Sequence, residues 1–196
     1  MKTTLLMLSM LSTLALLGAC TSRPGAVAPD LSRPSIAETR SVIFDGKTFV
    51  LKYQKSGLWE YFPENESVDA WNEMVDFTVV SADLNRFEPL DLGKRTVQLH
   101  QRENPNMPAI MSTDNRTGIL YLMLFYPKAL RKDGRYSEYS FFKYYRDGAT
   151  GQIIIFHFAR NVPADKPQTP DERSESVTTI GQEIVPVIKA FPLYRP

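Results

Sequence analysis

The chain of 196 residues contains a single cysteine, Cys20, and only two histidines. One cysteine cannot form a disulfide within the chain, and Cys20 lies close to the N-terminus. If Cys20 has a separate role there, the folded domain contains no disulfide, no thiolate metal site and no cysteine nucleophile. Its core must then supply the stability by itself.

An excess of charge of one sign is also missing. The chain has 23 Lys and Arg against 22 Asp and Glu, a formal net charge of +1. Loss of an N-terminal segment containing Lys2 would make the two counts equal. A neutral surface gives no long-range attraction for nucleic acid or anionic lipid, so we expect no nucleic-acid partner.

The common catalytic motifs are absent as well. The sequence contains no Gly-x-Ser-x-Gly elbow of the serine hydrolases. Residues 148–151 carry two glycines but lack the Lys-Ser/Thr end of a phosphate-binding loop, and they are better interpreted as a hairpin turn. We therefore predict no catalytic residue, no cofactor and no metal from motifs alone.

The N-terminus has a recognisable order of features. Lys2 gives a positive start, Leu5–Leu17 is an apolar run, and the small residues Gly18 and Ala19 precede Cys20. The run is shorter than the roughly 20 residues that span a bilayer, but it has the length of a signal-peptide core. The sequence LGAC that ends at Cys20 resembles the lipobox of bacterial lipoproteins.

The resemblance implies a lipid anchor. In that class the cysteine sulfur receives a diacylglyceryl group, signal peptidase II cuts before the cysteine, and the new amino group is acylated, for example with palmitate. Residues 1–19 would then be the signal peptide and Cys20 the lipidation site. Thr21 at the next position favours the outer membrane, with the domain facing the periplasm. The alternative is an ordinary secretory signal, cleaved near Ala19 or within residues 26–28.

A tether and one domain follow. Residues 20–40 comprise Cys20 and a segment with three prolines and no periodic apolar pattern, which we interpret as a flexible tether. Extended, it would reach roughly 60 Å from the lipid. Residues 41–196 are expected to form a single globular domain.

Hydrophobic patterning predicts the elements of that domain. Residues 42–53 resemble a hairpin around an Asp-Gly turn, and residues 58–62 a third strand. Residues 67–75 predict a short helix, because Val68, Trp71 and Val75 fall on one helical face. Further strands are expected at 96–101, 119–126, 136–145 and 152–158, the last three as an antiparallel meander.

A long C-terminal helix is expected to begin at Thr169, which opens a capping-box pattern, and to be kinked or ended early by Pro186. The expected fold class is therefore α+β: an antiparallel sheet of six or seven strands with a short helix and a long C-terminal helix packed on it. The order of these elements resembles the Mog1/PsbP-like sandwich. The apolar tail at 191–196 either docks on the domain or contacts a partner.

The two histidines could in principle share a metal with a carboxylate such as Glu103 or Glu138. No H-x-x-x-H or H-x-H spacing supports this. We therefore interpret His157 as a core histidine, on a strand that looks buried, and His100 as a surface histidine.

An aromatic strand offers a different kind of site. Residues 136–145 place rings on both faces, and the candidate lining of a ligand groove is Tyr121, Tyr139, Phe141 and Tyr144. The alternative is a cross-strand aromatic ladder within the core.

The sequence thus favours a lipid-anchored, non-enzymatic module that binds an envelope protein or an apolar ligand. The alternative is an envelope-polymer hydrolase that uses carboxylates and His100. Glu60, Glu64 and Glu66 are acidic candidates, although a chain with 22 acids offers many such sets.

Overall fold

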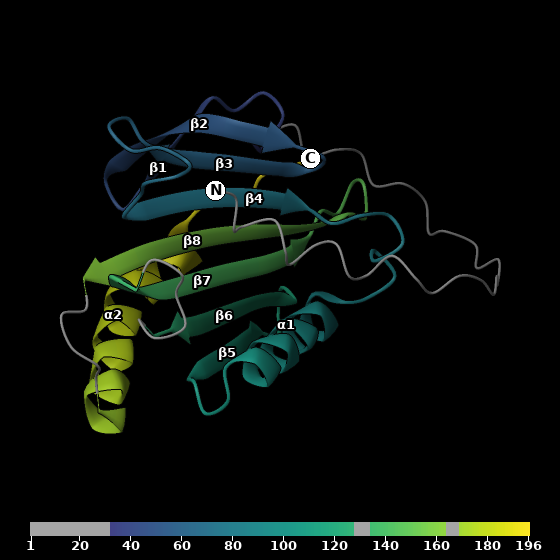
Figure 1. Cartoon of the computed structure of the whole chain (residues 1–196). Helices are drawn as coiled ribbons and strands as arrows, with labels where there is room; N and C mark the ends of the chain where they lie inside the picture. Colours follow the sequence, from purple (N-terminus) through teal and green to yellow (C-terminus); the bar gives the residue numbers. More distant parts are fainter. Residues whose placement is uncertain (1–31, 128–133, 164–168) are drawn as a thin grey trace.

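The computed structural model describes residues 32–127, 134–163 and 169–196, so Cys20 and the predicted signal peptide lie outside the described part. Within these ranges, one antiparallel sheet has the strand order β1-β2-β3-β4-β8-β7-β6-β5 (Figure 1). The strands are β1 (Ser41–Phe44), β2 (Lys47–Lys55), β3 (Leu58–Pro63), β4 (Glu73–Val79), β5 (Ala109–Asp114), β6 (Ile119–Tyr126), β7 (Tyr136–Arg146) and β8 (Ile153–Pro163).

Two helices in the described ranges cover the two faces of the sheet. Helix α1 (Pro89–Glu103) packs on one face, against β5, β6 and β7. Helix α2 (Pro170–Ala190) lies on the opposite face, and in Figure 1 its upper part passes behind β7 and β8. The fold is therefore α+β, as expected.

The larger core lies on the α2 face. It is rich in aromatic rings, which come from every strand except β5 and from the segment after α2. The smaller core joins α1 to the other face through Leu92, Leu120, Leu122, Leu124 and Tyr144. Alternate side chains of each central strand therefore serve two different cores, because successive residues of a strand point to opposite faces.

The central meander is confirmed. Strand β6 pairs with β7, and β7 pairs with β8, in continuous antiparallel register. The first hairpin and the third strand also form where the sequence predicts them. These segments are apolar on both faces or bounded by turn residues, so their identity is encoded locally.

The sheet has eight strands, one more than the six or seven expected. Two segments also form a different type of element from the one predicted. The helix expected at 67–75 is wrong: β4 begins at Glu73, and Trp71 packs on Phe62 just before it. Val75 instead enters the core on the α2 face. Val68 and Trp71 pack against a small separate cluster of Phe62, Met74 and Ala159, so the three apolar side chains with helical spacing do not share one core.

The strand expected at 96–101 is also wrong, because these residues lie in α1. The face of α1 that meets the sheet is formed by Leu92, Thr96 and His100, which are four residues apart. The Tyr144 hydroxyl donates a hydrogen bond to Thr96 Oγ1 at 3.0 Å. Strand β5, which follows α1 along the chain, supplies a strand that the sequence did not predict.

The start of α2 is confirmed. The Thr169 side chain accepts a hydrogen bond from the Glu172 backbone, and the Glu172 side chain accepts one from the Thr169 backbone. Pro186 does not end the helix, which continues to Ala190. Burial of Ile188 and Phe191 beyond the proline holds this last turn against the core.

Both ends of the described chain meet at the core. Ile36 is fully buried, and its backbone N–H donates to the Arg195 carbonyl at 2.9 Å. Phe191 and Tyr194 are buried as well, and the Tyr194 N–H donates to the Tyr145 hydroxyl at 2.9 Å. The C-terminal tail therefore docks on its own domain, and the packed chain already includes Ile36, upstream of the start expected at residue 41.

Candidate functional site

The aromatic residues proposed for a ligand groove do not share one surface. Tyr139 and Phe141 are buried in the larger core, on the α2 face. Tyr144 is buried in the smaller core, on the α1 face. Tyr121 is partly buried on the α2 face, with the Lys189 ammonium 5.5 Å from the centre of its ring. Three of these four side chains therefore fill the interior of the domain.

The second sequence candidate, His100, is not a surface residue. Its side chain is fully buried, and its ring meets Tyr126 edge-on at 4.7 Å. Neither ring nitrogen has a hydrogen-bond partner among the described residues. Burial lowers the pKa of His100, so the ring is neutral at pH 7. It packs as a core side chain, and no carboxylate of the described residues is hydrogen-bonded to it.

The structure instead brings three other ionisable side chains together. Glu60 on β3 lies opposite Asp76 on β4, and Asp76 lies opposite His157 on β8. Directly opposed residues of antiparallel strands point to the same face, with Cβ atoms roughly 5 Å apart. We call this set the acidic row: Glu60, Asp76 and His157. It lies on the α1 face, over strands outside the β5–β7 region that α1 covers.

His157 is held firmly in the acidic row. Its Nδ1 lies 2.7 Å from Asp76 Oδ2, and its ring stacks on Phe142 at 4.2 Å with an interplanar angle of 5°. Its Nε2 is buried and has no hydrogen-bond partner in the described ranges. Burial alone would lower the pKa of His157, but the charge of Asp76 and its hydrogen bond raise that pKa above the ordinary value.

Glu60 is a nearly buried acid with a strongly raised pKa. Its exposed fraction is 4%, and that of Asp76 is 7%. Burial, together with the charge of Asp76, raises the pKa of Glu60 from 4.5 to about 7, against the opposing effect of His157. The carboxyl group therefore exchanges its proton close to neutral pH.

Sequence reasoning named Glu60 and His157 separately but did not join them. Glu60 and Asp76 are neighbours because β3 pairs with β4, and His157, which is far away in the chain, joins them because β8 pairs with β4. A local signal did exist for two of them, because Glu60 and His157 are the lone ionisable residues in the apolar segments LWEYF and IIIFHF. Perturbed acids and bases of this kind cluster at functional sites.

Metal binding finds no support in the described residues, where no group of three His, Cys, Asp or Glu side chains is arranged to hold an ion. His100 and His157 have separate neighbours, Tyr126 for the first and Asp76 for the second. They do not form the pair that a shared metal would require.

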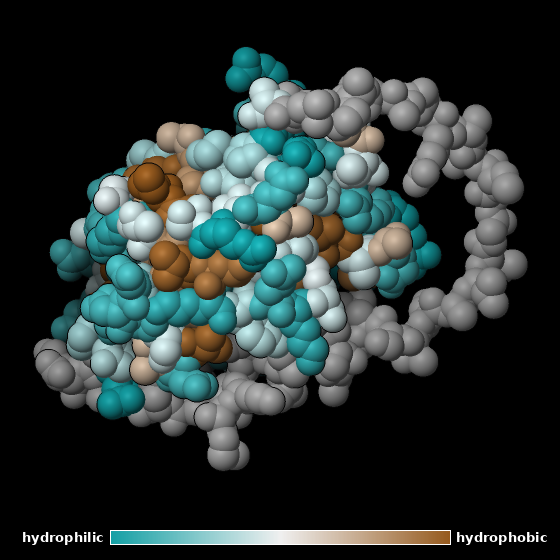
Figure 2. All heavy atoms as spheres, turned by 90° about the horizontal axis from the view of Figure 1, so that it is seen from above, coloured by the Kyte–Doolittle hydropathy of each residue, from teal (hydrophilic) through white to brown (hydrophobic). Residues whose placement is uncertain are grey.

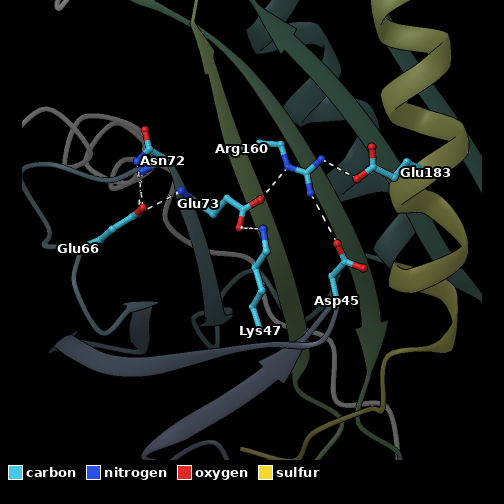
Figure 3. A network of polar contacts seen from close by, with 7 residues as sticks. All are labelled: Asp45, Lys47, Glu66, Asn72, Glu73, Arg160 and Glu183. Atoms are coloured by element: carbon cyan, nitrogen blue, oxygen red, sulfur yellow. Dashed lines mark hydrogen bonds and ion pairs between the residues drawn. The ribbon is translucent and has the colours of Figure 1, made fainter.

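A second polar network has a structural role on the α2 face (Figure 3). Arg160 on β8 donates to Glu73 on β4 and to Glu183 on α2, each at 2.8 Å, and lies 3.6 Å from Asp45 in the β1–β2 turn. Lys47 contacts Glu73 at 2.6 Å. The network joins α2 and the first hairpin to the centre of the sheet.

The two edges of the sheet expose apolar side chains. Ile43 on β1 is 71% exposed, Ile110 on β5 is 53% exposed and Met111 on β5 is 38% exposed. Figure 2, seen from the β1–β2 side, shows hydrophobic atoms reaching the surface between hydrophilic ones. Edge strands with exposed apolar residues are sites where another chain can pair.

Helix α1 borders a shallow polar hollow, lined by Phe87, Asp91, Lys94, Arg95 and Gln98. The guanidinium of Arg95 lies 4.2 Å from the centre of the Phe87 ring. In the described part of the chain, neither helix combines the length and apolar character needed to cross a bilayer.

Comparisons with known proteins identify a family and distant structural likenesses. A protein-family model matches residues 36–191. No curated protein matches the chain. A point mutant of protein Mog1 is 14% identical with a TM-score of 0.41, and the match covers 78% of this chain and 94% of that one.

Two further solved structures match with lower TM-scores. The Ran-binding protein Mog1p of Saccharomyces cerevisiae is 14% identical with a TM-score of 0.39, covering 74% of this chain and 85% of that one. Human STARD10 is 11% identical with a TM-score of 0.29, covering 72% and 69%. Mog1, whose element order the sequence resembles, is thus among the similar solved structures. The TM-scores and identities are too low to establish a shared function.

Proposed function

The chain belongs to the family whose model matches residues 36–191, and we propose that this member is a lipid-anchored protein of the bacterial cell envelope whose domain binds a partner protein. Cys20 carries the lipid, residues 1–19 are removed as a signal peptide, and the chain up to the docked segment at Ile36 serves as the tether. The domain faces the periplasm from the outer membrane.

The anchor rests on the order of features in the first twenty residues: a positive start, an apolar run, two small residues and Cys20. Two or more acyl chains on one residue hold a protein stably at a membrane, because each buried methylene contributes about 0.8 kcal/mol. The net charge near zero agrees with attachment through lipid rather than through a basic surface.

Packing of the core favours a protein partner over an apolar ligand. Tyr139, Phe141 and Tyr144 occupy the interior that a ligand groove along β7 would need. Their rings contact neighbouring side chains, as Phe125 does with Tyr139 at 5.0 Å. A ligand there would have to displace well-packed rings, which costs several kcal/mol.

The observation that carries the binding proposal is the exposed edge strand β5. In the described part of the chain it pairs with β6 on one side only, and its adjacent residues Ile110 and Met111 are both exposed. An extended segment of a partner can add to such an edge through backbone hydrogen bonds, while alternate side chains give specificity. Ile110 would then lie against an apolar side chain of the partner.

Site-specific photocrosslinking in intact envelopes tests this proposal. A crosslinker at position 110 should give a discrete protein adduct, and one at position 43 on the opposite edge strand should not. The adduct formed from position 110 should disappear when Met111→Lys is added, because charge on an edge strand opposes pairing. Equal adducts from both positions, or none from either, contradict docking at β5.

A second candidate function follows from the acidic row. An Asp76–His157 pair beside a carboxyl group with a pKa of about 7 is a suitable acid and base for hydrolysis. In this version of the hydrolase hypothesis, His157 replaces His100. Release of fragments from labelled peptidoglycan, abolished by Glu60→Gln and by Asp76→Asn, would favour this function over binding alone.

A further inference from the structure

The acidic row places two carboxyl groups directly opposite each other across the β3–β4 pair. Glu60 and Asp76 are register partners, as are Trp59 and Phe77 beside them. Like charges at directly opposed positions destabilise strand pairing. Because both side chains are almost fully buried, water screens their repulsion only weakly.

The groups that face Glu60 and His157 from neighbouring strands contain little positive charge. Asp76 faces Glu60 from β4, and Tyr53 lies opposite Glu60 on β2. The charge of Glu138 on β7 acts on His157, in the same direction as those of Asp76 and Glu60. The imidazolium of His157 can balance one carboxylate, and that one is Asp76, to which it is hydrogen-bonded.

The charge balance of the acidic row therefore depends on one proton. With His157 protonated, Asp76 ionised and Glu60 neutral, the row has no net charge. When Glu60 loses its proton to water, the row carries one net negative charge, and two carboxylates oppose each other between β3 and β4.

We propose that the acidic row is a proton-operated switch on the β3–β4 pairing: the proton on Glu60 holds the two strands together, and its loss loosens the β1–β2–β3 part of the sheet from β4 and β8. This inference is independent of the anchor and of docking at β5. It assigns a regulatory role to a cluster of charged groups that lies away from both edges of the sheet.

The direction of the effect follows from proton linkage. A carboxyl group whose pKa is higher in the folded than in the unfolded state stabilises the fold at pH values below the unfolded pKa. That contribution is lost as the pH rises through the folded pKa, so the loss occurs between about 4.5 and about 7 for Glu60. His157, whose pKa is also raised, acts in the same direction.

The first test needs no variant. The carboxyl carbon of Glu60 and the imidazole of His157 are titrated by NMR in the purified native protein, and backbone hydrogen exchange is measured at several pH values. We expect a Glu60 midpoint near 7. We also expect exchange in β3 and β4 to rise between pH 5 and 8 beyond the intrinsic rate, while exchange in β6 and β7 does not.

Variants then isolate the proton on Glu60. Glu60→Gln keeps the shape and fixes the neutral state, and Glu175→Gln on the exposed face of α2 is the matched control. Relative to Glu60→Gln, the folding equilibrium constant of the native protein should fall by roughly ten- to a hundred-fold between pH 4.5 and 7. The Glu175→Gln variant should follow the native protein throughout.

Two results overturn the proposal. A Glu60 midpoint near 4.5 shows that Glu60 holds no proton at neutral pH. A midpoint near 7 with the same exchange profile in β3, β4, β6 and β7 shows that the proton does not govern strand pairing.

Discussion

The ammonium group of Lys143 lies 2.6 Å from the carbonyl oxygen of Phe191, directly beyond the end of α2. It also donates to the carbonyls of Ile188 at 3.2 Å and Lys189 at 3.4 Å. The last carbonyls of a helix have no partner within the helix and carry partial negative charge. A buried lysine from the middle of the sheet therefore caps α2 and fixes the C-terminal tail.

Replacing this cap should weaken the domain. Lys143→Met keeps a long apolar side chain but leaves buried carbonyls without a donor, which costs about 1–3 kcal/mol. We expect a loss of about 2 kcal/mol at pH 7 in urea unfolding. An unchanged midpoint would mean that α2 is held by its apolar contacts alone.

The same lysine predicts a stability change in alkali. Burial lowers the pKa of Lys143 from 10.5 to about 8, so the folded state releases this proton earlier than the unfolded state. The part of the stability that depends on this pKa shift is complete above pH 10.5 and is lost as the pH falls through 8, so at pH 7 Lys143 contributes through the hydrogen bonds of its ammonium group alone. The difference in unfolding free energy between the native protein and Lys143→Met should therefore grow from pH 8 to pH 10.5. A constant difference would contradict the lowered pKa.

Gly93 lies on the face of α1 that packs tightly against Leu120 of the sheet. A Cβ atom at this position would lie 2.0 Å from Leu120 Cδ2, and Leu120 is fully buried. Gly93→Ala should cost about 1–3 kcal/mol from overpacking, even though alanine favours a helix by about 1 kcal/mol. Gly181→Ala on α2 is the control, because its Cβ would lie 3.4 Å from Met123 Sδ. Chemical denaturation should show a lower free energy of unfolding for Gly93→Ala and an unchanged one for Gly181→Ala.

The carboxylate partners of Arg160 should contribute unequally to the stability of the fold. The Glu73 side chain is 12% exposed and that of Glu183 is 53% exposed. Removing one member of a buried ion pair leaves an uncompensated charge, whereas exposed pairs contribute about 0–1 kcal/mol. Glu73→Gln should therefore lower the thermal midpoint clearly and Glu183→Gln barely. Equal shifts of the thermal midpoint would show that burial does not determine how much each ion pair stabilises the fold.

The sequence predicts the centre of the fold better than its periphery. Residues 119–126 and 152–158 are apolar on both faces, which is typical of strands covered on both sides, and both form central strands. In α1, apolar and polar residues alternate only over residues 97–100. An alternation this short does not distinguish a strand from a helix. The helix is revealed by the four-residue spacing of Leu92, Thr96 and His100, which face the sheet. Two of these three residues are polar, so the spacing does not stand out as an apolar pattern in the sequence.

The acidic row could not be predicted from the sequence for a different reason. Glu60, Asp76 and His157 meet only through the order β3-β4-β8, in which the last strand joins β4 after a long excursion through β5, β6 and β7. No local periodicity encodes that pairing. The prediction that His100 lies at the surface was wrong because it assumed a strand at 96–101, where the structure has α1.

The central claim of a lipid-anchored envelope protein is tested most directly by intact mass and membrane fractionation of the native protein beside a Cys20→Ser variant. The account predicts that the native protein begins at Cys20, carries acyl mass and sediments with the outer membrane, while the variant carries no acyl mass and leaves the membrane fraction. If both proteins are soluble and have only the mass of their polypeptide, Cys20 is not a lipidation site and the anchored role is contradicted.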